Sequence, residues 1–286
     1  MVGVLPKDIK NVLHLKTPEK PQTSSTQLYN ETRKIRQKVR GERNIAQQMF
    51  ALAVEAKYAH LHEINSEKKE ISHIFMAHPD SVKLFRAYSY AVILDSTYKT
   101  NMYKNSLIEM VGVIPTGSSF LIACSMIPTE PGIGLINTLK AVFLGVDHLL
   151  CRWHLNKAIN VKALEFYHTE SMKAFIITNP EDGWNNVINA LTKQEFQQAW
   201  VLFSRKWARM SAYIRRAWGE HAGKFVLCYT NEVFHLGNTA TSRVKSAHSL
   251  FKAWLKSSHL TLDTMWSHVH GMLEGQHSNI KKELED

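Results

Sequence analysis

Cysteine is scarce in this chain of 286 residues, and its scarcity narrows the classes of protein to consider. The sequence has three cysteines, Cys124, Cys151 and Cys228, which lie far apart. An odd number of cysteines at such wide spacing does not build a disulfide framework, and it excludes a four-cysteine zinc module.

Long apolar runs are also lacking, and no stretch is long enough to cross a membrane as a helix. The N-terminal sequence has neither the basic start nor the apolar centre of a signal peptide. We therefore expect an intracellular protein with no membrane partner. A hydrophobic content of 44% with 21% charged residues is typical of a globular chain with one or two domains.

Acidic residues are outnumbered, with 25 Asp and Glu against 35 Lys and Arg, so the formal net charge is +10. A basic surface favours a polyanionic partner, because neutralising phosphates drives much of DNA binding. We predict DNA as the partner and no small-molecule substrate. Self-association into a homo-oligomer stays open, as does the alternative of a basic protein that binds no nucleic acid.

A lone carboxylate, Asp95, follows a short apolar run at residues 90–94. Runs of this length that are rich in branched side chains are typical of buried strands. Aspartate is disfavoured inside strands, and a buried carboxylate needs a partner, a metal ion or a solvated cleft. Asp95 is therefore a candidate metal ligand. The alternative is a strand end that meets water.

Two more apolar runs follow Asp95, and each ends at a turn signal. Residues 107–114 lead into Pro115, and residues 120–127 lead into Pro128. Three strands with short connections predict an antiparallel meander. Ribonuclease-H-like nucleases and transposases begin with such a meander and an aspartate on its first strand. The predicted fold class is therefore α/β with a ribonuclease-H-like core.

Several short segments resemble the Mutator-like element (MULE) transposases in combination and in order. They are residues 94–101, 109–113, 116–117, 148–157 and 241–248. The resemblance covers most of the chain from about Ser72 onwards. It implies a transposon-derived protein whose ancestral role was DNA cleavage and strand transfer, with a nuclear location.

The resemblance also implies a two-metal centre, of which this chain keeps one ligand. The family pattern is an Asp on the first strand, an Asp on the fourth strand and a Glu on a late helix, which together hold Mg²⁺ or Mn²⁺. Asp95 matches the first position, but Lys245 occupies the Glu position and offers no oxygen ligand. The fourth strand is expected to be missing between Glu130 and Leu135, so productive metal binding is not expected.

Two acids near the expected deletion, Glu130 and Asp147, match no family motif. We interpret both as surface carboxylates. The alternative, an active transposase that uses one of them as a ligand, requires that acid to lie beside Asp95.

A second metal hypothesis concerns Cys151 and His154, which match the family's Cys-x-x-His motif. A thiolate and an imidazole can bind zinc, but two ligands leave a zinc site incomplete. The other ligands would have to come from His168, His235 or His248. The alternative is a small buried cysteine beside a hydrogen-bonded histidine.

Three segments are expected along the chain. Residues 1–26 form an N-terminal remnant and linker, residues 27–88 a basic helix and small hairpin, and residues 89–286 a transposase-like domain with a helical insertion at about 155–235. An aromatic stripe that includes Phe196 and Phe203 is expected to face the core of that insertion.

The basic helix carries the candidate DNA-binding residues. These are Arg33, Lys34, Arg36, Arg40 and Arg43. The alternative for such a charge run is a solvated helix face. Short strands are expected at residues 58–64, 71–76 and 146–150.

The function predicted from these patterns is that of a transposase-like protein that has lost its enzymatic activity. Two alternatives remain. One is a domesticated DNA-binding or transcription-regulatory protein, since plant far-red-response regulators share this core. The other is a truncated copy with no function, which the expected gap after Glu130 suggests.

Overall fold

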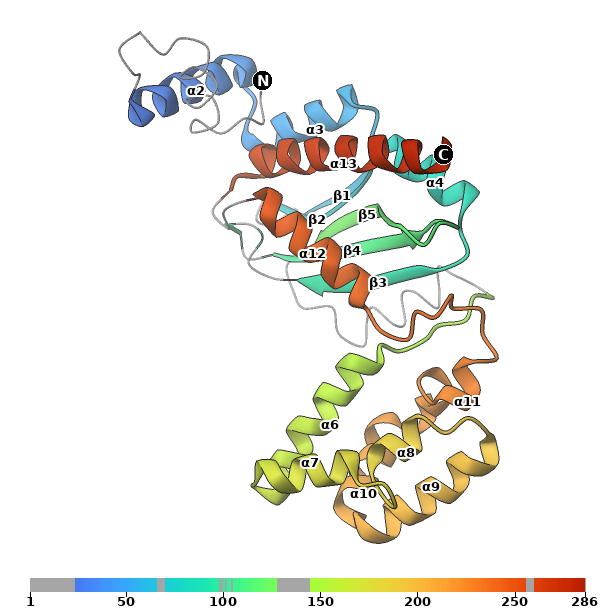
Figure 1. Ribbon diagram of the computed structural model, residues 1–286. Coiled ribbons are helices and arrows are strands. Elements are labelled where there is room, and N and C mark those ends of the chain that lie inside the picture. The colour runs from blue at the N-terminus through green and yellow to red at the C-terminus, as the bar shows by residue number, and fades with distance from the viewer. Residues whose placement is uncertain are drawn as a thin grey trace. The chain divides into compact units, whose positions relative to one another are not determined.

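A five-stranded antiparallel sheet is the centre of the larger part of the chain, so the α/β fold class is confirmed (Figure 1). The computed structural model describes residues 24–65, 70–97, 100, 102–103, 105–127, 145–255 and 260–285. The chain forms two compact units, one of residues 1–131 with 244–286 and one of residues 132–243. These boundaries differ from the division expected from the sequence, which separated residues 27–88 from the rest.

The first unit contains the sheet and the helices that cover it. The strands are β1 Ala59–Asn65, β2 Glu70–Ala77, β3 Val92–Thr97, β4 Ser106–Val113 and β5 Ser119–Ile127. The helices are α2 Ser25–Arg40, α3 Ile45–Glu55, α4 Pro79–Ala87, α12 Ser242–Leu255 and α13 Leu262–Glu285.

The predicted meander is confirmed as β3, β4 and β5, and the predicted hairpin as β1 and β2. The strand order is β1-β2-β5-β4-β3, so the hairpin joins the meander through antiparallel pairing of β2 with β5. The strand that carries Asp95, β3, is therefore the edge of the sheet among the described strands. Among the described strands, the sheet extends beyond β5, and none pairs with β3 on its other side, where the resemblance implies a fourth strand.

The prediction of a strand at residues 146–150 is wrong, because the structure describes these residues and they form no strand. In this segment, Leu150 N donates a backbone hydrogen bond of 2.9 Å to Lys224 O. The expected deletion after Glu130 and the helix expected at residues 135–143 lie outside the described residues. The basic region forms two helices and not one, because Gly41 ends α2 with a φ of +60°, a conformation that suits glycine.

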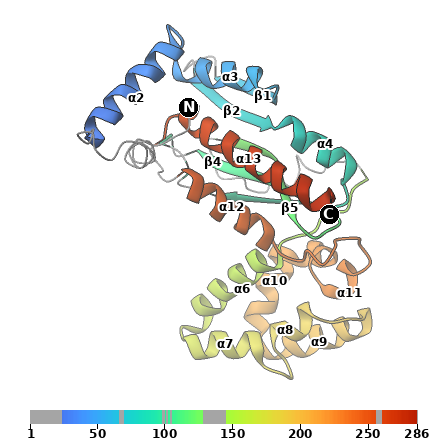
Figure 2. The same cartoon turned by 45° about the horizontal axis from the view of Figure 1, so that its top comes forward.

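Three helices cover one face of the sheet and bury the main core (Figure 2). Helices α3 and α13 lie side by side, and their apolar faces include Met49 and Trp266. Helix α12 adds Val244, Phe251 and Leu255, which are at most 3% exposed. The spacing of these three residues is that of one helical face, so α12 is held against the sheet along its whole length.

The second unit is helical in its described part, as the predicted insertion requires. Its helices are α6 Arg152–Tyr167, α7 Glu170–Thr178, α8 Trp184–Ile188, α9 Lys193–Lys206, α10 Ala208–Trp218, the 3-10 helix η1 Gly219–Lys224 and α11 Leu227–Thr230. The predicted aromatic stripe packs into its core, where Phe203 is fully buried and Phe196 packs against the cluster. Trp184 is 1% exposed in the same core and donates a hydrogen bond of 2.9 Å to Asn156 Oδ1.

Candidate functional site

Asp95 on β3 lies directly opposite Glu109 on β4 in the antiparallel register. Side chains of such a pair project from the same face of the sheet, so two carboxyl groups share one row. Glu109 is paired in turn with Cys124 on β5, which extends the row across three strands. Asp95 is half-buried, and its Oδ1 accepts a hydrogen bond of 2.8 Å from Ser96 N.

Glu109 is fully buried and faces a histidine from α12. His248 Nε2 lies 3.0 Å from Glu109 Oε2, and the imidazole is 8% exposed. The distance is that of an ion pair, but the angles are not those of a hydrogen bond, and both Glu109 oxygens lack a hydrogen-bond partner in the described part of the chain. A buried carboxyl group in this state favours its neutral form.

Burial sets the protonation of this pair. Burial raises the pKa of Glu109 to about 8, with a smaller rise from Asp95 and an opposing effect of Lys252. Burial also lowers the pKa of His248, although Asp95 acts in the opposite direction. Near neutral pH, both groups therefore favour the uncharged form.

Two lysines of α12 flank the buried pair. Lys245, where the resemblance implied a glutamate, is one helical turn before His248, and its ammonium lowers the pKa of that imidazole. Lys252, which is exposed, lies one turn after His248 and acts on Glu109. The helix that should supply a metal-binding carboxylate thus brings an imidazole and two cations to the Asp95 row.

The clusters of potential metal-ligand side chains among the described residues do not include Asp95. Among the described residues, sets of three or more close metal-ligand side chains occur only around His78, and they involve Asp80, His270, Glu274 and His277. Sequence reasoning named none of these five as a ligand. Asp147 is exposed and belongs to the second unit, while Glu130 lies outside the described residues.

Cys151 and His154 lie at the start of α6 in the second unit. The half-buried Cys151 thiol is 3.4 Å from Thr241 Oγ1 and accepts a hydrogen bond of 3.3 Å from Thr241 N. His154 is exposed and packs edge-on against Trp153. The other proposed ligands are dispersed: His168 ends α6, His235 follows α11, and His248 contacts Glu109.

The basic residues of the N-terminal region differ in their solvent exposure and in their hydrogen bonds. Arg33 and Lys34 are exposed on α2, and Lys34 pairs with Glu31 at 2.8 Å. Arg36 and Arg40 are half-buried. Arg43 donates hydrogen bonds to Arg40 O and Val39 O, at 3.1 and 3.0 Å, and so caps the end of α2. Arg33 and Lys34 are therefore the most accessible of the four candidate residues on α2.

Sequence reasoning missed Glu109, and it named His248 only as a possible zinc ligand. One signal was present, because Glu109 is a lone carboxylate within the apolar run of residues 107–114. Such a residue needs a buried partner. Nothing local to the strand identifies the partner, because His248 arrives from a helix far along the chain.

Fold and site together define a mixed α/β protein whose edge strand carries an aspartate beside a buried glutamate–histidine pair. No family model and no solved structure matches the chain. The chain is similar to the protein FAR1-RELATED SEQUENCE 5 of Arabidopsis thaliana, with 22% identity over 230 residues, which is 68% of this chain. The match covers 27% of that protein, so the chain spans about a quarter of its relative's length.

In the described ranges, none of the helices combines the length and the apolar character that crossing a bilayer requires.

Proposed function

We propose that this chain is a transposase-derived protein that binds DNA in the nucleus without cleaving it. The similarity to FAR1-RELATED SEQUENCE 5 and the motif resemblance to MULE transposases support the transposase-derived origin. The net charge of +10 and the exposed basic residues of α2 support DNA as the partner.

The observation that carries the loss of cleavage is the His248–Glu109 pair beside Asp95. A two-ion centre needs several ionised oxygen ligands around two cations. Here Glu109 favours the neutral form, its oxygens are buried, and Lys245 and Lys252 already place positive charge at the row. These residues do not fit a two-ion Mg²⁺ or Mn²⁺ centre, so we derive no strand-transfer step through one.

Lysines in this place support a different use of the ancestral site. A phosphate backbone is attracted to ammonium groups without any metal ion. The half-buried Lys245 and the exposed Lys252 lie on α12, whose apolar side is fixed against the sheet. The edge near Asp95 can therefore attract DNA where the ancestral site would have cut it.

Fluorescence anisotropy of labelled duplex DNA in the presence of a chelator tests this function. The full chain should bind without added metal, and the logarithm of its affinity should fall linearly with the logarithm of salt concentration. A protein that binds duplex DNA only when Mg²⁺ or Mn²⁺ is present, or that fails to bind at low salt, would contradict the proposal.

A further inference from the structure

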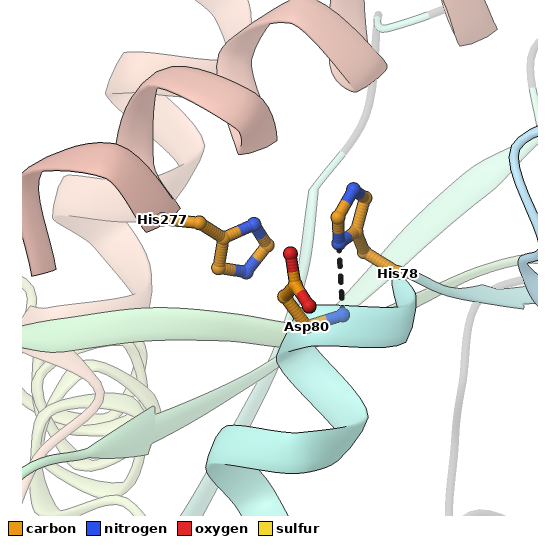
Figure 3. Close-up of side chains that lie close together, drawn as sticks. All are labelled: His78, Asp80 and His277. Atoms are coloured by element: carbon orange, nitrogen blue, oxygen red, sulfur yellow. Dashed lines mark hydrogen bonds between the residues drawn. The ribbon is translucent and has the colours of Figure 1, made fainter. Parts of the chain in front are cut away.

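Five potential metal ligands gather where the N-terminus of α4 meets α13. Figure 3 draws His78, Asp80 and His277. His78 and Asp80 come from the start of α4. His270, Glu274 and His277 come from α13, at a spacing that places them on one side of the helix. Both helices belong to the first unit, and no function described above uses these residues.

The five residues form two overlapping groups that share His78. One is His78, Asp80 and His277, and the other is His78, His270 and Glu274; in each, the donor atoms lie within 4.8 Å of one another. Figure 3 shows the Asp80 carboxyl group between the imidazoles of His78 and His277. Tetrahedral zinc, with bonds of about 2.0–2.1 Å, holds its ligands about 3.4 Å apart. Small side-chain rotations would bring the donors to that spacing.

Hydrogen bonds fix the proton position on His277. Ser81 Oγ donates to Leu121 O at 2.6 Å and has no second proton, so His277 Nε2 must donate to Ser81 Oγ across 3.0 Å. The lone pair of His277 is then on Nδ1, which is buried and has no hydrogen-bond partner among the described residues. A buried acceptor without a partner is costly, and a metal ion is one way to satisfy it.

The orientation of His277 is that of a metal-binding histidine. Such a ring normally binds the ion through one nitrogen and donates the other N–H to a protein oxygen, which fixes the ring and its tautomer. Ser81 provides that oxygen, and it is itself fully buried and anchored to β5. His78 differs, because its Nδ1 accepts a hydrogen bond of 3.1 Å from Asp80 N, so that its Nε2 carries the proton and faces Glu274 Oε1 at 2.9 Å. An ion bound at His78 Nδ1 would replace the hydrogen bond from Asp80 N, while the N–H on Nε2 would still be oriented by Glu274.

We propose that His78, Asp80 and His277 bind a divalent transition-metal ion, of which zinc fits best, and that this ion joins α4 to α13. Two imidazoles with a carboxylate suit zinc better than Mg²⁺ or Ca²⁺, which take oxygen ligands. Glu274 Oε1 lies 2.9 Å from His78 Nε2, where it accepts the ring N–H and orients the imidazole. The ion would strengthen a junction that Ser81 and His277 already begin.

The charge states of the ligands agree with this assignment. Burial lowers the pKa of His277 to about 4, so the ring is neutral at physiological pH and binds metal without losing a proton. The hydrogen bond from Lys83 lowers the pKa of Asp80, which is therefore ionised. A cation at the N-terminus of α4 opposes the helix dipole, and the negative charge of Asp80 offsets that effect.

Zinc titration of the metal-stripped full chain tests the proposal, with the melting temperature and competition against a chromophoric chelator as readouts. The parent should bind about one equivalent and melt at a higher temperature. His277→Ala and Asp80→Asn should each weaken zinc binding by about 10-fold or more. Asp80→Asn keeps the backbone N–H that caps α4, so it stays informative if His277→Ala folds poorly.

Two controls separate this site from other zinc ligands. His62→Ala removes an exposed histidine of β1 and should leave the zinc response unchanged. Cys151→Ser with His154→Ala should also leave it unchanged. The spectrum of the Co²⁺-loaded parent should show nitrogen and oxygen ligation without a thiolate charge-transfer band. The proposal is overturned if the parent does not respond to zinc, if the Cys151 and His154 variant abolishes the response, or if His270→Ala abolishes it while His277→Ala does not.

Discussion

Glu109 Oε2 and His248 Nε2 lie 3.0 Å apart in the core, on the row of the sheet that begins at Asp95. This pair occupies the place where α12 packs on β4. Beside Asp95 it places a buried acid and a buried base that favour their neutral forms.

The pair should give the protein a characteristic dependence on pH. The folded-state pKa of Glu109 is raised from 4.5 to about 8. The contribution of its neutral carboxyl group to the stability of the protein is therefore lost as pH rises through that range. The lowered pKa of His248 acts in the opposite direction and only below its usual value of 6.5. Between pH 6.5 and 8, Glu109 therefore dominates.

Glu109→Gln mimics the neutral carboxyl group and should remove this dependence. When the pH is raised from 6.5 to 8, the difference in free energy of unfolding between the variant and the parent should shift by about 1–2 kcal/mol in favour of the variant. Chemical denaturation at both pH values measures the difference. Parallel loss of stability in parent and variant would show that Glu109 does not titrate in this range.

Lys245 should control the protonation of His248. Replacing it with glutamate removes an ammonium that lowers the imidazole pKa and adds a negative charge, so Lys245→Glu should raise the pKa of His248. Lys245→Gln removes only the positive charge and should give a smaller rise. Titration of the imidazole by NMR checks the order, and equal pKa values in all three proteins would contradict the assigned geometry.

Gly112 should be intolerant of a side chain because of its position in β4. A Cβ atom there would lie 2.6 Å from the ring of Phe120, which is fully buried on β5. Gly112→Ala should therefore destabilise the protein by about 1–3 kcal/mol. Gly275→Ala, in open space on α13, is the matched control and should be neutral or slightly stabilising. Equal effects of the two changes would refute the close contact.

The exposed basic residues of α2 should contribute to DNA affinity without sequence preference. Arg33→Gln with Lys34→Gln should weaken binding and reduce the salt slope by up to about 2, whatever the duplex sequence. Arg215→Gln with Arg216→Gln on α10 removes the same charge from exposed positions elsewhere and should have a smaller effect. If the two double variants lose equal affinity, general charge and not α2 drives binding.

Local patterns were sufficient to predict the meander, the hairpin and the aromatic core of the helical unit. Apolar runs closed by turns predicted β3 to β5, and helical spacing predicted the burial of Phe203. The pairing of Ile74 with Met126, which joins the hairpin to the meander, depends on contacts between distant segments that no local pattern encodes. The strand expected at residues 146–150 failed for a related reason, because an apolar run becomes a strand only where a partner strand is available.

The site was harder to predict than the fold. Asp95 and Lys245 could be singled out from motifs, but Glu109 acquires its role from the register with Asp95 and the packing of α12. The histidines of α4 and α13 likewise form a cluster only when the two helices meet.

We propose that the Asp95 row does not support metal-dependent DNA cleavage. The most direct measurement is nicking of a labelled duplex by the purified full chain with Mg²⁺ or Mn²⁺, compared with Asp95→Asn under the same conditions. We predict that the two proteins give the same background cleavage while both still bind the duplex. Cleavage by the parent that Asp95→Asn abolishes would contradict the account.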